Sequence, residues 1–176
     1  MLIFYKENCT LMVIFGIDPG FATIGYGVID YVGNHFKVLD YGVMTTPAHT
    51  PFSDRLAGIY EQVTELLQRY KPDAVSIEEL FFNTNITTGI QVAHARGVLV
   101  LGAKQQNIPI YEYTPLQVKQ AITGYGRAEK RQVMEMTKMF LNLDKIPRPD
   151  DAADALALAI CHAHSAGSAL YSEDRI

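Results

Sequence analysis

The strongest constraint on the fold is a run of small and aliphatic residues late in the sequence. Residues 152–160 read Ala-Ala-Asp-Ala-Leu-Ala-Leu-Ala-Ile, so only one side chain in nine is polar. Alanine and leucine are among the best helix formers, which predicts a helix here. A helix that is apolar around most of its circumference has to be buried. We therefore predict that this helix packs hard against a sheet.

The rest of the chain supplies that sheet and further helices. Alternating and β-branched residues, with a Gly33-Asn34 hairpin turn, predict strands at 13–18, 24–31, 35–45, 74–78 and 108–113. Apolar residues at helical spacing predict helices at about 56–70, 87–104, 115–123, 128–141 and 150–164. Ser53 or Asp54 is expected to cap the first helix, and Asp150 the last. This order predicts a mixed α/β sheet with helices on both faces.

A single domain is expected over residues 12–166, preceded by a leader at 1–11 and followed by a tail at 167–176. No apolar run reaches the ~18 residues that cross a bilayer, and the first residues do not read as a signal peptide. Cys9 and Cys161 do not make a disulfide framework, which favours a reduced, cytoplasmic setting. Cys161 and His162 are adjacent, so on a helix they cannot both face one zinc ion.

The charge of the chain is unevenly distributed. The net charge is −4, which taken alone argues against nucleic-acid binding. Residues 96–138, however, carry seven basic and three acidic residues, so this segment is +4 and the remainder −8. A locally basic face on an acidic protein can bind phosphates, although solvated helix faces would give the same pattern.

Four acidic residues stand where a sheet could bring them together. Asp18 and Glu78 each close a predicted strand, at the edge where open α/β sheets bind ligands. Asp151 and Asp154 are three residues apart on the last predicted helix, so they share a face. Acids favour helix N-termini in any case, which explains Asp151 better than Asp154. Two interpretations stay open: one carboxylate site, or strand-end acids and a helix cap that never meet.

Carboxylates in one cleft would repel each other and take up protons unless cations bound there. Oxygen ligands suit Mg²⁺. Two such ions about 3.5–4 Å apart can activate a water and stabilise the leaving oxygen in phosphodiester cleavage. Four carboxylates match the charge of two divalent ions. The acids thus suggest a site for two Mg²⁺ ions, for which Mn²⁺ could substitute.

Six motifs occur in order over residues 12–164: Gly16-Ile-Asp-Pro-Gly20, Ile77-Glu-Glu-Leu-Phe81, His94-Ala-Arg-Gly97, Gln117-Val-Lys-Gln120, Ala128-Glu-Lys130 and Asp151-Ala-Ala-Asp154-Ala-Leu-Ala. Together they resemble the RuvC family of Holliday-junction resolvases. Each motif alone is weakly specific, and Gly-x-Asp-x-Gly also occurs in actin- and hexokinase-like ATPases. Six motifs in the family's order are not expected by chance.

The resemblance implies an RNase H-like fold with a five-stranded sheet flanked by helices. It also implies that the catalytic, metal-binding acids are Asp18, Glu78, Asp151 and Asp154. The neighbouring acids Glu79 and Asp150 fall outside the family pattern.

Three further residues match family positions that contact DNA. Lys119 and Lys130 correspond to basic residues beside the scissile phosphate, where an ammonium neutralises phosphate charge. Phe81 corresponds to an aromatic residue that contacts distorted bases near the crossover, although either Phe81 or Phe82 could be a core residue. The ordinary alternative for the two lysines is a surface position.

The activity implied by the resemblance is magnesium-dependent resolution of four-way DNA junctions in homologous recombination and DNA repair. Paired symmetric nicks would be made by hydrolysis and leave 5′-phosphate ends. A homodimer is expected, with its interface on the small residues Gly89, Ala93 and Gly97, unless these pack against the chain's own sheet. The RuvA–RuvB branch-migration complex is the expected partner.

Two other functions stay open: an RNase H-like nuclease acting on RNA or another branched nucleic acid, and a junction-binding module without catalysis. An actin-like ATPase is excluded because the chain is too short for a duplicated domain and has no Walker-type phosphate loop.

Overall fold

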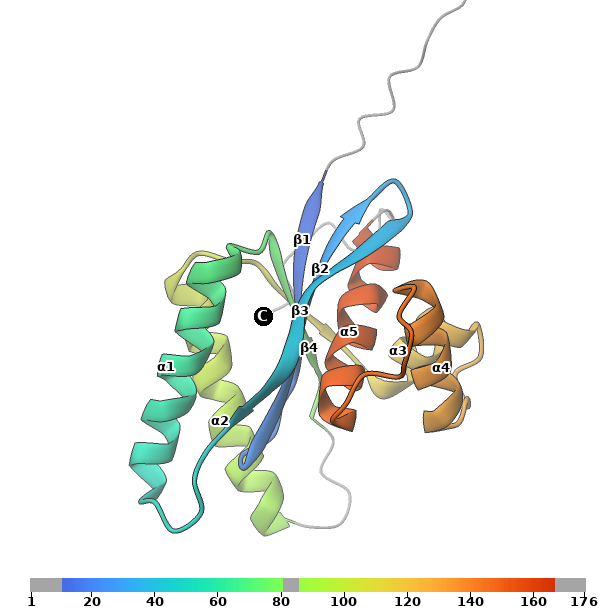
Figure 1. Ribbon diagram of the computed structural model, residues 1–176. Helices are drawn as coiled ribbons and strands as arrows, with labels where there is room; N and C mark the ends of the chain where they lie inside the picture. The colour runs from blue at the N-terminus through green and yellow to red at the C-terminus, as the bar shows by residue number, and fades with distance from the viewer. Residues whose placement is uncertain (1–10, 81–85, 167–176) are drawn as a thin grey trace, which may run out of the picture.

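The computed structural model describes residues 11–80 and 86–166 (Figure 1). The strands are β1 (Met12–Asp18), β2 (Thr23–Val32), β3 (His35–Thr45), β4 (Ala74–Glu78) and β5 (Ile110–Tyr113). The helices are α1 (Phe52–Tyr70), α2 (Ile86–Gln105), α3 (Pro115–Thr123), α4 (Lys130–Phe140) and α5 (Asp150–Ala166). Across these described residues, no helix combines the length and the apolar character needed to span a membrane.

The strands form one mixed sheet in the order β3-β2-β1-β4-β5. The first three strands form an antiparallel meander, closed between β2 and β3 by Gly33 and Asn34, whose positive φ angles suit a tight hairpin turn. The strands β4 and β5 then add parallel to β1 on its other side. The parallel half of the sheet therefore ends its strands β1, β4 and β5 at one common edge.

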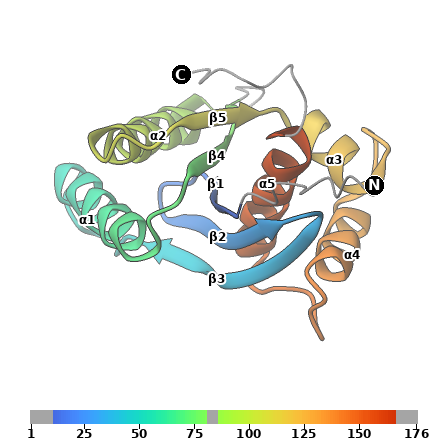
Figure 2. The ribbon, with the colours of Figure 1, turned by 90° about the horizontal axis from the view of Figure 1, so that it is seen from above.

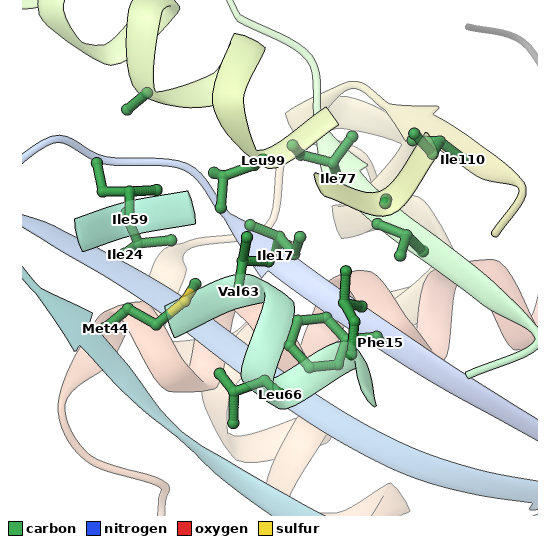
Figure 3. Close-up of a cluster of buried hydrophobic side chains, with 14 of the residues drawn as sticks. Phe15, Ile17, Ile24, Met44, Ile59, Val63, Leu66, Ile77, Leu99 and Ile110 are labelled. Atoms are coloured by element: carbon green, nitrogen blue, oxygen red, sulfur yellow. The ribbon is translucent and has the colours of Figure 1, made fainter. Parts of the chain in front are cut away.

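Helices cover both faces of this sheet, as Figures 1 and 2 show: α1 and α2 lie on one face, and α3, α4 and α5 on the other. Each face has its own hydrophobic core. The cluster against α1 and α2 includes Phe15, Ile17, Ile59, Val63 and Leu99 (Figure 3). The cluster on the other face is built largely from α5. The expected five-stranded mixed sheet with helices on both faces is confirmed.

The helix α5 approaches β1 and β2 so closely that two of the strand positions beneath it have no room for a side chain. A Cβ atom added at Gly16 of β1 would lie 2.0 Å from the carbonyl oxygen of Ala155, and one at Gly25 of β2 would lie 2.0 Å from that of Asp151. Such contacts are far inside van der Waals distance. Glycine is therefore required at both positions. The predicted close packing of this helix depends on these two glycines of the strands.

Several predicted boundaries differ by one or two residues. Neither Ser53 nor Asp54 caps α1, because the helix begins earlier, at Phe52, with Pro51 at the N-cap position. The helix α4 begins at Lys130 rather than Ala128, because Glu129 forms a capping box with Gln132. Likewise, α5 already includes Asp150. The strand β5 begins at residue 110 rather than 108.

The tight packing of α5 makes a prediction for stability. We expect Gly16→Ala to lower the free energy of unfolding by about 1–3 kcal/mol, because the added methyl group forces α5 away from β1. Urea denaturation measures this change. The matched control is Gly58→Ala in α1, where a Cβ atom meets nothing within 4 Å and should raise stability by up to about 1 kcal/mol. Equal effects of the two substitutions would contradict the packing argument.

Candidate active site

The alternation of side chains along β1 places Asp18 on the face of the sheet that α5 covers. Phe15 and Ile17 belong to the core on the opposite face, whereas Gly16 lies beneath α5. Successive side chains of a strand point to opposite faces, so Asp18 lies on the same side as Gly16. It is also the last residue of β1, at the edge where the parallel strands end.

The same argument places Glu78 beside it. The hydroxyl group of Ser76 donates a hydrogen bond of 2.8 Å to the carbonyl oxygen of Leu158 in α5, so Glu78, two residues further along β4, faces α5 too. The strands β1 and β4 are parallel neighbours in which Ile17 pairs with Ile77. Asp18 and Glu78 therefore close adjacent strands, at the same edge and on the same face.

The first turns of α5 bring the other two acids to this edge. Asp151 and Asp154 are both partly buried, and the main chain of Asp151 lies directly over Gly25, the residue that pairs with Asp18. Without the glycine at position 25 the helix could not take this position. The close packing of α5 on the sheet is thus also what brings the acids of α5 to the end of β1.

A cavity of about 230 Å³ opens between the sheet edge, α3, α4 and α5. Its polar lining consists of three acids and two lysines, and its walls are apolar. The polar residues are Asp18, Glu78, Asp154, Lys119 and Lys130; the apolar ones are Pro115, Val118, Val133, Ala157 and Leu158. Asp151 is not part of this lining, although its charge acts on Asp18.

The crowding of acids in a buried place changes their protonation. Burial, followed by the charges of Glu78, Asp154 and Asp151, raises the pKa of Asp18 to about 8. The pKa of Glu78 is also raised, first by burial and then by the charge of Asp154. Lys130 acts in the opposite direction on both groups. The site therefore favours cations: with none bound, Asp18 keeps a proton well above the usual range of an aspartate.

The ammonium group of Lys130 places a positive charge beside the acids. Its Nζ atom lies 2.8 Å from Oδ2 of Asp154 and 3.7 Å from Oδ2 of Asp150. Asp150 is paired in addition with Arg148. The pKa of Lys130 is raised, chiefly by its hydrogen bond to Asp154. The ammonium group thus connects α4 to the start of α5, at the mouth of the acid cluster.

The donor chemistry of the cluster fits a divalent metal ion. Carboxylate oxygens are what Mg²⁺ prefers, and a bound cation would relieve the repulsion that raises the pKa of Asp18. Within residues 11–80 and 86–166, however, no three His, Cys, Asp or Glu side chains are arranged closely enough to hold an ion.

The residues that the sequence singled out have different outcomes. Asp18, Glu78, Asp154, Lys119 and Lys130 come together around one cavity. Asp151 lies beside it. Phe81 and Phe82 fall outside the described residues.

Sequence reasoning missed the contact between Asp150 and Lys130. Asp150 falls outside the acids of the family pattern, yet its Oδ2 atom lies 3.7 Å from the ammonium group of Lys130. The only signal was an additional acid at the start of a helix, which has an ordinary explanation in the helix dipole. Whether Asp150 reaches Lys130 depends on the distance between α4 and α5, which the sequence does not give.

The Cys161-His162 pair proves to be part of the core. The Nδ1 atom of His162 lies 2.8 Å from the hydroxyl oxygen of Tyr113, and its ring packs on Tyr111. Burial lowers the pKa of His162 to about 4 and raises that of Cys161 to about 12. Tyr113 is the strand partner of Glu78, so this neutral histidine helps to fix β5 next to the acid cluster.

Comparison with known proteins agrees with the geometry. The family model described as crossover junction endodeoxyribonuclease RuvC matches residues 14–162. Proteins with that same name in Alkaliphilus oremlandii and Alkaliphilus metalliredigens are 59% and 60% identical over 154 residues, covering 88% of this chain and 94% of each relative.

Solved structures show the same similarity. The structure of T. thermophilus RuvC in complex with a Holliday junction substrate is 38% identical, with a TM-score of 0.84 over 88% of this chain and 94% of that chain. The yeast mitochondrial Holliday junction resolvase has the same fold at 13% identity, with a TM-score of 0.64 over 86% of this chain and 77% of that one.

The raised pKa of Asp18 predicts that the metal-free protein loses stability as the pH rises. The folded state binds a proton at Asp18 up to about pH 8, whereas in the unfolded chain this carboxyl group loses it near pH 3.8. Between these values folding takes up a proton, so alkali favours unfolding. His162, buried and neutral, has the opposite effect below its ordinary pKa of 6.5, which leaves pH 6.5–8 as the informative window.

We expect the free energy of unfolding of the metal-free protein to fall by on the order of 1 kcal/mol per pH unit in this window. Denaturation by urea in the presence of a chelator measures it. In Asp18→Asn, which carries no titrating group at this position, the decline should largely disappear. The same decline in both proteins would assign it to another group.

Proposed function

The chain belongs to the RuvC family of crossover junction endodeoxyribonucleases, and from that membership we propose that it resolves four-way (Holliday) DNA junctions by paired symmetric nicks, in homologous recombination and DNA repair. The observation that carries this proposal is the cavity in which three of the four expected acids meet two lysines. Acids alone would repel DNA. The lysines supply the positive charge that a phosphate needs beside them.

In the proposed site, Asp18, Glu78, Asp151 and Asp154 hold the metal. The family is one of metal-dependent nucleases; for this chain we propose Mg²⁺, two ions per site, with Mn²⁺ as a substitute. When bound, these ions supply an activated water and stabilise the departing 3′ oxygen, which leaves a 5′-phosphate. The carboxylates of β1 and β4 sit at a sheet edge, and those of α5 on a tightly packed helix, so the backbone positions from which these side chains would reach the ions are well defined.

Lys119 and Lys130 would dock the scissile phosphate. Lys119 comes from α3 and Lys130 from α4, and both line the cavity that contains the acids. Two ammonium groups from separate helices can contact different oxygens of one phosphate and so orient it toward the carboxylates. Phe81, which lies outside the described residues, is proposed to contact bases near the crossover.

We place this activity in one nuclease domain, residues 12–166, with 1–11 as a leader and 167–176 as a tail. We further propose a cytoplasmic protein that acts with the RuvA–RuvB branch-migration complex. The cytoplasmic setting rests on the absence of a disulfide framework, and the RuvA–RuvB partner rests on the family.

The active unit is proposed to be a homodimer formed through α2. Ile90 and Leu101 of this helix are each 52% exposed, and a Cβ atom at Gly97 would meet nothing within 4 Å. These three positions are seven and four residues apart, so they share one face of the helix. An apolar helical face in solvent with a glycine at its centre suits close contact with a second copy. Such a dimer presents two sites to the two strands that must be cut.

The function is tested on a synthetic four-way junction with and without Mg²⁺. We expect paired, symmetric nicks that need the metal and fall by at least about 100-fold in Asp18→Asn, while junction binding persists, because that substitution removes a proposed metal ligand. Asp144→Asn, which makes the same chemical change at an exposed position, should cut normally.

Junction binding without cleavage, under several divalent ions and junction sequences, would leave a binding module in place of a nuclease. Faster cleavage of an RNA-containing duplex than of the junction would favour the related RNA-directed activity.

The dimer is tested by charge placed on the face of α2. We expect Leu101→Glu to shift the protein from dimer to monomer in sedimentation equilibrium, because it puts a carboxylate into an apolar contact. Met139→Glu is the control: that residue is 69% exposed, on α4. A dimer that survives Leu101→Glu would place the interface elsewhere.

A further inference from the structure

Lys130 holds Asp154 in the manner in which a metal ion would. Its ammonium lies at hydrogen-bond distance, 2.8 Å, from a carboxylate oxygen of Asp154, which the proposed function makes a metal ligand. A carboxylate has two oxygens that can accept, but Lys130 contacts the Oδ2 atom of Asp154, and a cation bound to the same carboxylate repels the ammonium group. A divalent metal and Lys130 therefore weaken each other's contact with Asp154.

Asp150 is a second carboxylate with which the ammonium group of Lys130 can pair. It lies at the start of α5, with one oxygen 3.7 Å from Nζ of Lys130 and the other oxygen paired with Arg148. Asp150 is not among the four acids expected to bind metal. A shift of about 1 Å would turn the distant contact with Asp150 into a hydrogen bond, since such bonds measure about 2.7–2.9 Å.

We propose that Lys130 and the divalent cation compete for Asp154, and that Asp150, oriented by Arg148, is a positioning residue that receives the Lys130 ammonium when the cation binds. This inference rests on the proposed metal site. In the metal-free protein, Lys130 neutralises part of the acid cluster. With metal bound, it stays beside the cavity on Asp150, close to where a phosphate would dock.

The second lysine of the cavity behaves differently. Lys119 lines the same cavity but, among the described residues, forms no ion pair with a carboxylate. Removing either lysine takes one positive charge from the lining of the cavity. Only Lys130 is in contact with a proposed metal ligand, Asp154. Lys119→Gln is therefore the control for the loss of a cavity charge that holds no carboxylate.

The first test measures Mn²⁺ binding to the DNA-free protein by calorimetry, for the wild type, Lys130→Gln and Lys119→Gln. We expect Lys130→Gln to bind Mn²⁺ about fivefold more tightly or better, because a charged hydrogen bond no longer has to be broken. Lys119→Gln should gain at most about twofold, since salt screens the distant charge. Equal gains in the two variants, or none in Lys130→Gln, would overturn the competition.

The second test is a double-mutant cycle for Asp150. We expect Asp150→Asn to weaken Mn²⁺ binding about threefold in the wild type, because Lys130 then has no other carboxylate to move to, but by only about 1.5-fold when Lys130→Gln is also present. Equal losses in both backgrounds would mean that Asp150 acts only by its charge.

Both side chains are substantially exposed, 55% for Lys130 and 43% for Asp150, so these substitutions leave the core intact. Because Mn²⁺ binding is measured without DNA, the result is separate from junction cleavage. If the wild type makes metal-dependent nicks but Lys130→Gln binds Mn²⁺ no more tightly than the wild type, the proposed function stands. Only the competition between Lys130 and the metal for Asp154 is then rejected.

Discussion

The contact between the backbone of α5 and the glycines of the sheet is the interaction on which the rest of the structure depends. Most helices pack on a sheet through side chains, which keep the two backbones apart. Here Gly16 and Gly25 let the carbonyl oxygens of Ala155 and Asp151 come to where a Cβ atom would otherwise be. This close approach buries the apolar side of α5, and it brings the acids of its first turns down to the ends of β1 and β4. Stability and the geometry of the site therefore have the same origin.

The same packing creates an electrostatic conflict. Acids that belong to an apolar, tightly packed region lose their hydration, and they lie close enough to repel each other, which is why Asp18 holds its proton so firmly. A core optimised for stability alone would not place them there. Lys130 offsets part of the conflict from the opposite wall of the cavity. The remaining unfavourable charge is what gives a site of this kind its affinity for metal ions.

Much of this arrangement could be predicted from the sequence. The buried α5, the strands that end on Asp18 and Glu78, and the sheet with helices on both faces follow from hydrophobic periodicity and from turn residues, which are local signals. The convergence of Asp18, Glu78 and Asp154 was one of two open interpretations, because no local pattern shows which strands become neighbours. The family resemblance chose between them, and the parallel pairing of β1 with β4 supplies the physical reason.

What could not be predicted depended on distances between helices. The pairing of Lys130 with Asp150 and Asp154 joins two elements whose separation is set by packing. The bond between His162 and Tyr113 likewise requires α5 to lie against β5, so a sequence motif that looked like a possible metal site became a neutral core contact. Helix ends also moved: the capping box at Glu129 starts α4 later than its apolar pattern suggested.

The order in which the elements occur along the chain has a consequence for synthesis in the cell. Asp18 and Glu78 leave the ribosome early, but Asp154 belongs to α5, the last helix of the described residues, and α5 supplies more of the core on its face of the sheet than any other element. Until it emerges, one side of the sheet is bare and the cluster of acids lacks a member. A nascent chain thus lacks the full cluster of acids while it is still incomplete, and it acquires that cluster in the same step that completes its core.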